Sequence, residues 1–139
     1  TIATGKNWEI TADRVEHVQP YLDSLAYRID SDEGSIVFSG DTRPCKALTN
    51  LAYKADMLIM ECVRTEDDIR GTASARSETD TIGAGKTAAD AEVKKLVLCH
   101  QGMRLEEPEI KVQAIGEIRS MYGGPTIWGE ELLEIPWSS

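Results

Sequence analysis

The chain has 139 residues, 41% of them hydrophobic and 28% charged, which is enough for one domain with its own core. No apolar run approaches the roughly 20 residues of a membrane-spanning helix, and nothing resembles a signal peptide, so we expect no membrane partner. The formal net charge of −9, with scattered Lys and Arg, makes nucleic acid an unlikely partner. The first residue is Thr1 rather than Met, which indicates a processed chain or part of a longer product.

The first half of the chain is rich in strand patterns. A strand is expected over residues 8–18, before Pro20. Residues 25–29 and 35–38 flank a turn-rich stretch and predict a β-hairpin with a loop of about five residues. A short helix is then expected over residues 47–55, because its apolar residues share one face.

The second half alternates between strands and helices. Continuous apolar runs predict buried strands at residues 57–60 and 96–99. Helices are expected over residues 81–91 and 109–122, a long loop over 64–80, and a last strand within 126–135. This order predicts an α/β layered fold.

Polar residues of types that bind metals or take part in catalysis follow several of these strands. His17, Asp41, Glu61 and His100 each come at or just after an expected strand end. Sites in layered α/β proteins form beyond strand ends, and imidazole and carboxylate groups are ligands for zinc and related metals. A structural histidine and an ordinary Gly-Asp-Thr turn are equally compatible with the pattern.

The three cysteines, Cys45, Cys62 and Cys99, match no zinc knuckle or disulfide framework. Cys62 and Cys99 lie in apolar runs, where a reduced cysteine packs as a small hydrophobe. This usage indicates a reducing compartment, most simply the cytoplasm.

Six motifs follow one another along the chain. They are Asp13-Arg14-Val15-Glu16-His17, Ala26-Tyr27-Arg28-Ile29-Asp30, Ser35-Ile36-Val37-Phe38-Ser39-Gly40-Asp41-Thr42, Leu51 to Glu61, Ala84-Gly85-Lys86-Thr87-Ala88 and Val93 to His100. In order and spacing these motifs resemble those of metallo-β-lactamase-fold hydrolases, in the branch of arylsulfatase-like, lactonase-like and transfer-RNA 3′-processing enzymes. The resemblance implies the C-terminal half of a metallo-β-lactamase αββα sandwich over residues 1–139.

The resemblance also implies a dinuclear metal site. His17 and His100 match the histidines that complete the first and second metal sites, and Asp41 matches the aspartate that bridges the two metals. The cofactors implied are two divalent metal ions, zinc first, with manganese or iron as alternatives. Glu61 matches an acidic position that supports a ligand or the neighbouring loop rather than binding metal.

Two features depart from the family pattern. The signature His-x-His-x-Asp-His motif is absent, so an N-terminal half, as a separate or cleaved chain or as residues preceding these, is expected as a partner. A homo-oligomer stays open. Glu78 stands where relatives often carry a histidine that protonates the leaving group, and we consider it both as a general acid and as a solvated loop residue.

The resemblance implies a metal-dependent hydrolase in which Asp41 and Glu78 are catalytic. The expected substrate is a small ester, lactone or sulfate-type molecule, attacked by a metal-bound hydroxide. One alternative is a phosphodiesterase or nuclease of the same fold. The other is a non-catalytic half-domain that acts as a binding or assembly partner.

Overall fold

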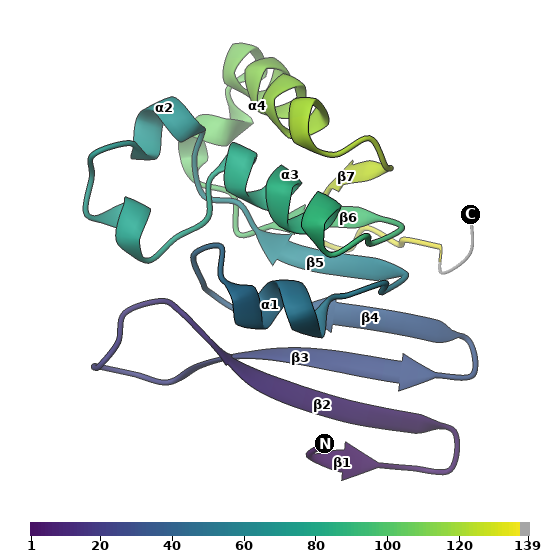
Figure 1. The fold of residues 1–139 in the computed structure, drawn as a ribbon. Helices are drawn as coiled ribbons and strands as arrows, with labels where there is room; N and C mark the ends of the chain where they lie inside the picture. The colour runs from purple at the N-terminus through teal and green to yellow at the C-terminus, as the bar shows by residue number, and fades with distance from the viewer. Residues whose placement is uncertain (137–139) are drawn as a thin grey trace.

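A computed structural model describes residues 1–136 of the chain and shows one seven-stranded mixed sheet with helices packed against it (Figure 1). The strands lie in the sheet in their order along the chain, from β1 to β7. The sheet divides into an antiparallel part at the N-terminal side and a parallel part at the C-terminal side.

The antiparallel part contains four strands: β1 (Ala3–Thr4), β2 (Trp8–Val15), β3 (Ser24–Ser31) and β4 (Gly34–Phe38). The hairpin of β3 and β4 is confirmed, but its strands extend to Ser31 and Gly34, so the connection is the two residues Asp32 and Glu33. The sequence did not predict β1, which is only two residues long.

The parallel part contains β5 (Met57–Glu61), β6 (Leu96–Cys99) and β7 (Thr126–Trp128) beside β4. The connections between these strands carry α1 (Lys46–Leu51), α3 (Thr81–Asp90) and α4 (Pro108–Met121). The helices lie on one face of the sheet, as Figure 1 shows. This arrangement follows from the uniform handedness of connections between parallel strands.

The core lies between these helices and the sheet. Alternate residues of the parallel strands, such as Val37, Leu58 and Leu98, point into it and are buried. Leu48 from α1, small residues such as Ala84 and Ala88 from α3, and Ile118 from α4 complete the packing. Ala-rich α3 therefore lies close to the sheet, and the core fixes the positions of the strand ends.

Within residues 1–136, the opposite face of the antiparallel part is largely apolar and carries no helix. Tyr27 pairs with Phe38, and Phe38 is in register with Ile59, so these side chains form a row across three strands. Tyr27 and Phe38 are each 38% exposed. We call the following set the open sheet face: Ile10, Ala12, Leu25, Tyr27, Ile29, Ile36, Phe38 and Ile59.

The stretch from residue 64 to residue 80 was expected to be an irregular loop, and the structure places two short helices in it. They are α2 (Glu66–Ile69) and the 3₁₀ turn Ser74–Arg76. Thr65 caps α2 by accepting a hydrogen bond from the Asp68 N–H at 3.3 Å. A second 3₁₀ turn covers Met103–Glu106. Within residues 1–136, no helix combines the length and apolar character needed to cross a membrane.

Candidate metal centre

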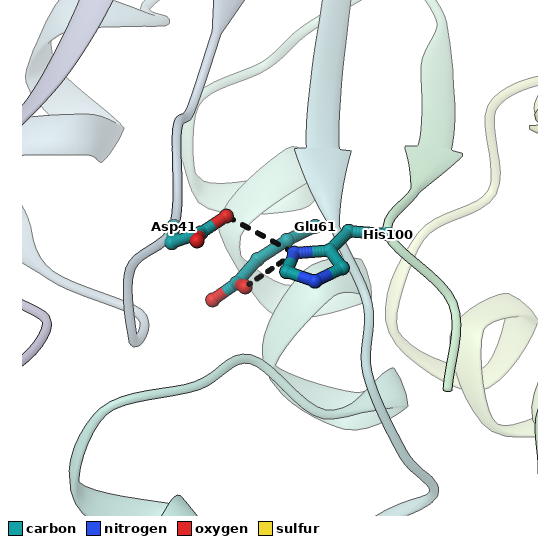
Figure 2. A group of neighbouring side chains, drawn as sticks. All are labelled: Asp41, Glu61 and His100. Atoms are coloured by element: carbon teal, nitrogen blue, oxygen red, sulfur yellow. Dashed lines mark hydrogen bonds and ion pairs between the residues drawn. The ribbon is translucent and has the colours of Figure 1, made fainter. Parts of the chain in front are cut away.

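Three polar side chains meet where β4, β5 and β6 end (Figure 2). Asp41 follows β4, Glu61 is the last residue of β5, and His100 follows β6. Because neighbouring parallel strands end at the same edge of a sheet, residues far apart in sequence come together there.

The backbone at two strand ends has an unusual conformation. Gly40 has a φ of +60°, and a Cβ atom at this position would lie 2.6 Å from the Leu25 carbonyl oxygen. Only glycine fits this turn, which directs Asp41 toward the strand ends. His100 also has a positive φ of 53°, a conformation that costs free energy for a residue with a Cβ atom and is concentrated at functional sites.

The three side chains lie within contact distance. His100 Nδ1 is 3.0 Å from Asp41 Oδ1 and 3.7 Å from Glu61 Oε2. One possible ligand atom from each residue lies within 4.8 Å of the other two. The side chains of His100 and Asp41 are 59% and 52% exposed, whereas that of Glu61 is 2% exposed. The cluster therefore has two accessible donors above a buried carboxylate.

Glu61 uses only one of its two carboxylate oxygens. Oε1 accepts backbone N–H groups from Thr42, at 2.8 Å, and from Thr79, at 3.1 Å. Oε2 is buried and has no hydrogen-bond partner among the described residues. Burial raises the pKa of Glu61 to about 7, and the nearby Asp41 carboxylate adds to this shift, while the two N–H groups and His100 oppose it.

These donors fit a divalent cation. Carboxylate oxygen and imidazole nitrogen are metal ligands, and a buried polar atom without a partner is the feature that a bound cation would satisfy. The expected ligands Asp41 and His100 are thus brought together, and Glu61, which we expected to have a supporting role, joins them.

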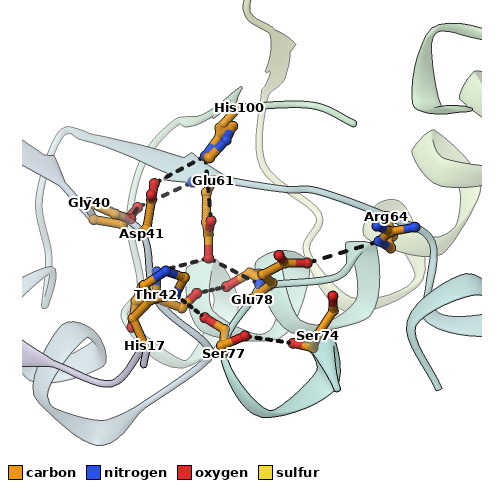
Figure 3. Close-up of polar contacts among 12 residues, drawn as sticks. His17, Gly40, Asp41, Thr42, Glu61, Arg64, Ser74, Ser77, Glu78 and His100 are labelled. Atoms are coloured by element: carbon orange, nitrogen blue, oxygen red, sulfur yellow. Dashed lines mark hydrogen bonds and ion pairs between the residues drawn. The ribbon is translucent and has the colours of Figure 1, made fainter. Parts of the chain in front are cut away.

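His17 lies outside this cluster. Its Nδ1 is 2.6 Å from the backbone oxygen of Ser77, in the 64–80 stretch (Figure 3). The turn before it is tied to Thr42, whose hydroxyl donates to the Glu16 carbonyl oxygen at 3.0 Å. His17 is therefore connected to the cluster through Thr42, and its role as a metal ligand stays a prediction.

Glu78 turns toward Arg64, as Figure 3 shows. Its Oε2 is buried, lies 3.9 Å from Arg64 Nε, and has no hydrogen-bond partner within residues 1–136. Among the described residues, the Glu78 side chain forms its ion pair with Arg64 and none with the Asp41, Glu61 and His100 cluster. Its role as a general acid also stays a prediction.

Two other polar residues near the strand ends have structural roles. Arg104 Nη1 lies 2.5 Å from Asp68 Oδ1 and forms an ion pair with it. Burial raises the pKa of the Cys99 thiol to about 11, with smaller contributions from Glu61 and Asp41. This thiol is therefore protonated at neutral pH and is not a nucleophile beside His100.

Sequence reasoning missed the hydrogen-bond network around Glu61. Thr42 and Thr79 are fully buried, and the Thr79 hydroxyl donates to the Thr42 carbonyl oxygen at 2.6 Å. The signal in the sequence was a glutamate that ends an otherwise apolar strand, but nothing in the sequence connects it to Thr79, 18 residues later.

Known proteins provide the comparison for this fold and site. No protein-family model matches the chain. In sequence it is 34% identical over 90 residues to a ribonuclease Z of Myxococcus xanthus, covering 65% of this chain and 28% of that protein. It is also 34% identical over 87 residues to a ribonuclease Z of Bacillus licheniformis, covering 63% of this chain and 28% of that protein.

Among solved structures, the metallo-β-lactamase fold protein YhfI from Bacillus subtilis superimposes with a TM-score of 0.76 at 20% identity, covering 92% of this chain and 49% of YhfI. The short form of human tRNase Z superimposes with a TM-score of 0.68 at 18% identity, covering 97% of this chain and 45% of that one. The chain has the metallo-β-lactamase fold. The expected α/β class and the resemblance to this superfamily are confirmed, and the chain spans only 28% of the length of the two ribonuclease Z relatives.

The expected partners need correction. A small-molecule substrate was expected and nucleic acid was considered unlikely, but the relatives in sequence are proteins named ribonuclease Z. The expectation was wrong because it rested on a net charge of −9, which is summed over this chain alone. A net charge does not report the local potential at a site that other segments help to form. The cytoplasmic location stays a prediction.

Proposed function

We propose that this chain is part of a metal-dependent nuclease that hydrolyses phosphodiester bonds in RNA, with transfer-RNA precursors as the substrate class. One observation carries the proposal: Asp41 and His100 meet at the strand ends of a metallo-β-lactamase fold, in a chain similar in sequence to ribonuclease Z. The superposition with the short form of human tRNase Z supports the metallo-β-lactamase fold on which this proposal depends.

The domain proposal is that residues 1–139 form the C-terminal half of one metallo-β-lactamase domain. The chain covers just under half of the superimposed structures, and the open sheet face presents an apolar surface. A second β-layer that packs there would bury Tyr27 and Phe38. The remaining metal ligands would come from that half.

Asp41 and His100 would hold the metal ions, which we propose to be zinc. When bound, these ions supply Lewis-acid chemistry at the phosphate and stabilise its developing negative charge. The chain's own contribution is to hold the ligands in place. The Gly40 turn precedes Asp41, the Glu61 carboxylate holds the N–H of Thr42 that follows it, and the strand end of β6 presents His100.

Glu78 is the proposed general acid. Its Oε2 has no hydrogen-bond partner among the described residues, so we propose this atom as the one that meets the leaving oxygen. The 3.9 Å contact with Arg64 directs this carboxyl group, so a change in the 64–80 stretch on substrate binding would be needed to bring it to the site.

The test uses the whole protein that contains this chain and a transfer-RNA precursor with a 3′ extension. Asp41→Asn should lower the rate of 3′ cleavage by about 100-fold or more, because it removes charge from the centre that stabilises the transition state. Asp90→Asn is the matched control, since Asp90 is equally exposed at 52% but only pairs with Lys86. Equal rates for the two variants would reject the metal centre. RNA binding without cleavage by the unmodified protein would instead favour the non-catalytic alternative.

A further inference from the structure

One oxygen of the Glu61 carboxylate has no hydrogen-bond partner in the part of the chain that the structure describes. The Glu61 side chain is 2% exposed, and Oε2 is buried without a hydrogen bond from any described residue. The only ion-pair contact of Glu61 within residues 1–136 is with His100 Nδ1, at 3.7 Å. Buried carboxylates are normally paired with a cation or coordinate a metal, because an isolated buried charge is costly.

The orientation of this carboxylate is fixed. Two backbone N–H groups, from Thr42 and Thr79, hold Oε1 at 2.8 and 3.1 Å. Because Oε1 is bonded on the side of Thr42 and Thr79, Oε2 is directed to the side of Asp41 and His100, as Figures 2 and 3 show. The unpartnered atom therefore points into the cluster.

A purely structural role does not explain both oxygens. If Glu61 only held the Thr42 turn and the Thr79 segment, one acceptor oxygen would be sufficient, and an uncharged glutamine would provide it. The second oxygen is instead buried in the cluster beside Asp41 and His100, where no hydrogen-bond donor of the described residues meets it. A divalent cation between these groups would offset this cost.

We propose that Glu61 is itself a metal ligand, so that this chain supplies two carboxylates and one imidazole, from Asp41, Glu61 and His100, to one ion. This inference rests on the proposed function and extends its ligand set. Two carboxylate charges balance the charge of one divalent cation. An oxygen-rich set of this kind accommodates manganese more readily than a set dominated by imidazoles.

The experiment is a metal titration of the whole protein after removal of metal with a chelator. Free Mn²⁺ is followed by its paramagnetic resonance signal, and Zn²⁺ binding is followed by calorimetry. The variants are Glu61→Gln, which keeps an acceptor for Thr42 and Thr79, Asp41→Asn, and the control Asp90→Asn, at an exposed carboxylate that pairs with Lys86. Glu61→Gln and Asp41→Asn should each weaken Mn²⁺ binding by more than about 100-fold, because losses of about 10- to 100-fold are known for groups that only orient a ligand. Asp90→Asn should bind as the unmodified protein does.

The outcomes separate this inference from the proposed function. If Glu61→Gln weakens the binding of both metals by less than about 100-fold while Asp41→Asn weakens it by more, Glu61 is not a ligand and at most positions one, and the metal centre remains. If Asp41→Asn also binds normally, the metal centre itself is wrong. Should Glu61→Gln fail to fold, a crystal structure of the unmodified Mn²⁺-loaded protein decides. Glu61 Oε2 bonded directly to the ion supports the inference, and a water molecule between them overturns it.

Discussion

At the scale of single residues, Thr79 contacts both Glu61 and Thr42 with its backbone N–H and its side-chain hydroxyl. Its N–H holds Glu61 Oε1, and its hydroxyl donates to the buried Thr42 carbonyl at 2.6 Å. Replacing it with valine keeps the shape and leaves that carbonyl unpartnered. Thr79→Val should lower the free energy of unfolding by about 1–3 kcal/mol, whereas Thr79→Ser should retain most of it. Urea denaturation of the two variants measures this, and equal losses would show that the hydroxyl is unimportant.

Asp56 gives a prediction for pH dependence. Hydrogen bonds from Lys94, then from the Ser35 backbone N–H, hold the pKa of Asp56 below its usual value. A lowered pKa in the folded state stabilises the protein above the unfolded-state pKa near 3.8, and this stabilisation is lost as pH falls through the folded-state value. Asp56→Asn should therefore cost about 1–2 kcal/mol at neutral pH and progressively less in acid.

Urea unfolding of both proteins at about pH 7 and about pH 3 checks this sign. A cost that is the same at the two pH values would mean that the charge of Asp56 contributes nothing. Lys86, which pairs with Asp90 on the surface, provides the control, because its replacement by methionine should change stability little.

Residue types at strand ends predicted part of the site. Asp41 and His100 were expected and do meet, because each follows a buried strand of the same parallel sheet edge. Glu61 was expected near the site, but its ligand-like geometry depends on N–H groups from Thr42 and Thr79, which no local pattern reveals. The position of His17 beside Ser77 likewise depends on the path of a long connection.

At the scale of elements, the close packing of α3 against α4 depends on a glycine. A Cβ atom at Gly85 would lie 2.9 Å from the Ile118 carbonyl oxygen and 3.0 Å from Met121 Cβ. Gly85→Ala should therefore destabilise the protein by about 1–3 kcal/mol through overpacking. Gly116, exposed in α4 with nothing within 4 Å of such an atom, is the matched control.

Gly116→Ala should stabilise the protein by roughly 0.5–1 kcal/mol, because alanine is the better helix former. Thermal unfolding of the two variants should thus move the melting temperature in opposite directions. A stabilising Gly85→Ala would show that α4 can shift away from α3 without loss.

Most elements could be predicted from hydrophobic patterns, since the buried strands β5 and β6 and the amphipathic α4 have strong signals. Short elements could not. Both α2 and the 3₁₀ turn Ser74–Arg76 are too short for a periodic signal and are polar in sequence. Local capping, as at Thr65, determines such turns.

At the scale of the whole molecule, the open sheet face has a direct consequence. Leu25, Tyr27 and Phe38 are each more than a third exposed, which forms an apolar patch of the kind that marks an interface. We expect the isolated chain to self-associate in sedimentation velocity, and Tyr27→Lys with Phe38→Glu to reduce that association. Val112→Lys is the control, because Val112 is 72% exposed on α4 and lies off this face. A monomeric, cooperatively melting isolated chain would contradict the proposal that another layer covers the sheet.

We propose that Asp41 and His100 of this chain are ligands of a metal centre. Native mass spectrometry with metal analysis tests this on the whole protein, purified without a chelator. We expect roughly two divalent ions per particle, lost when Asp41 and His100 are both replaced by alanine. A particle that contains no bound metal, or one whose metal content is unchanged by those replacements, would show that these residues do not hold metal.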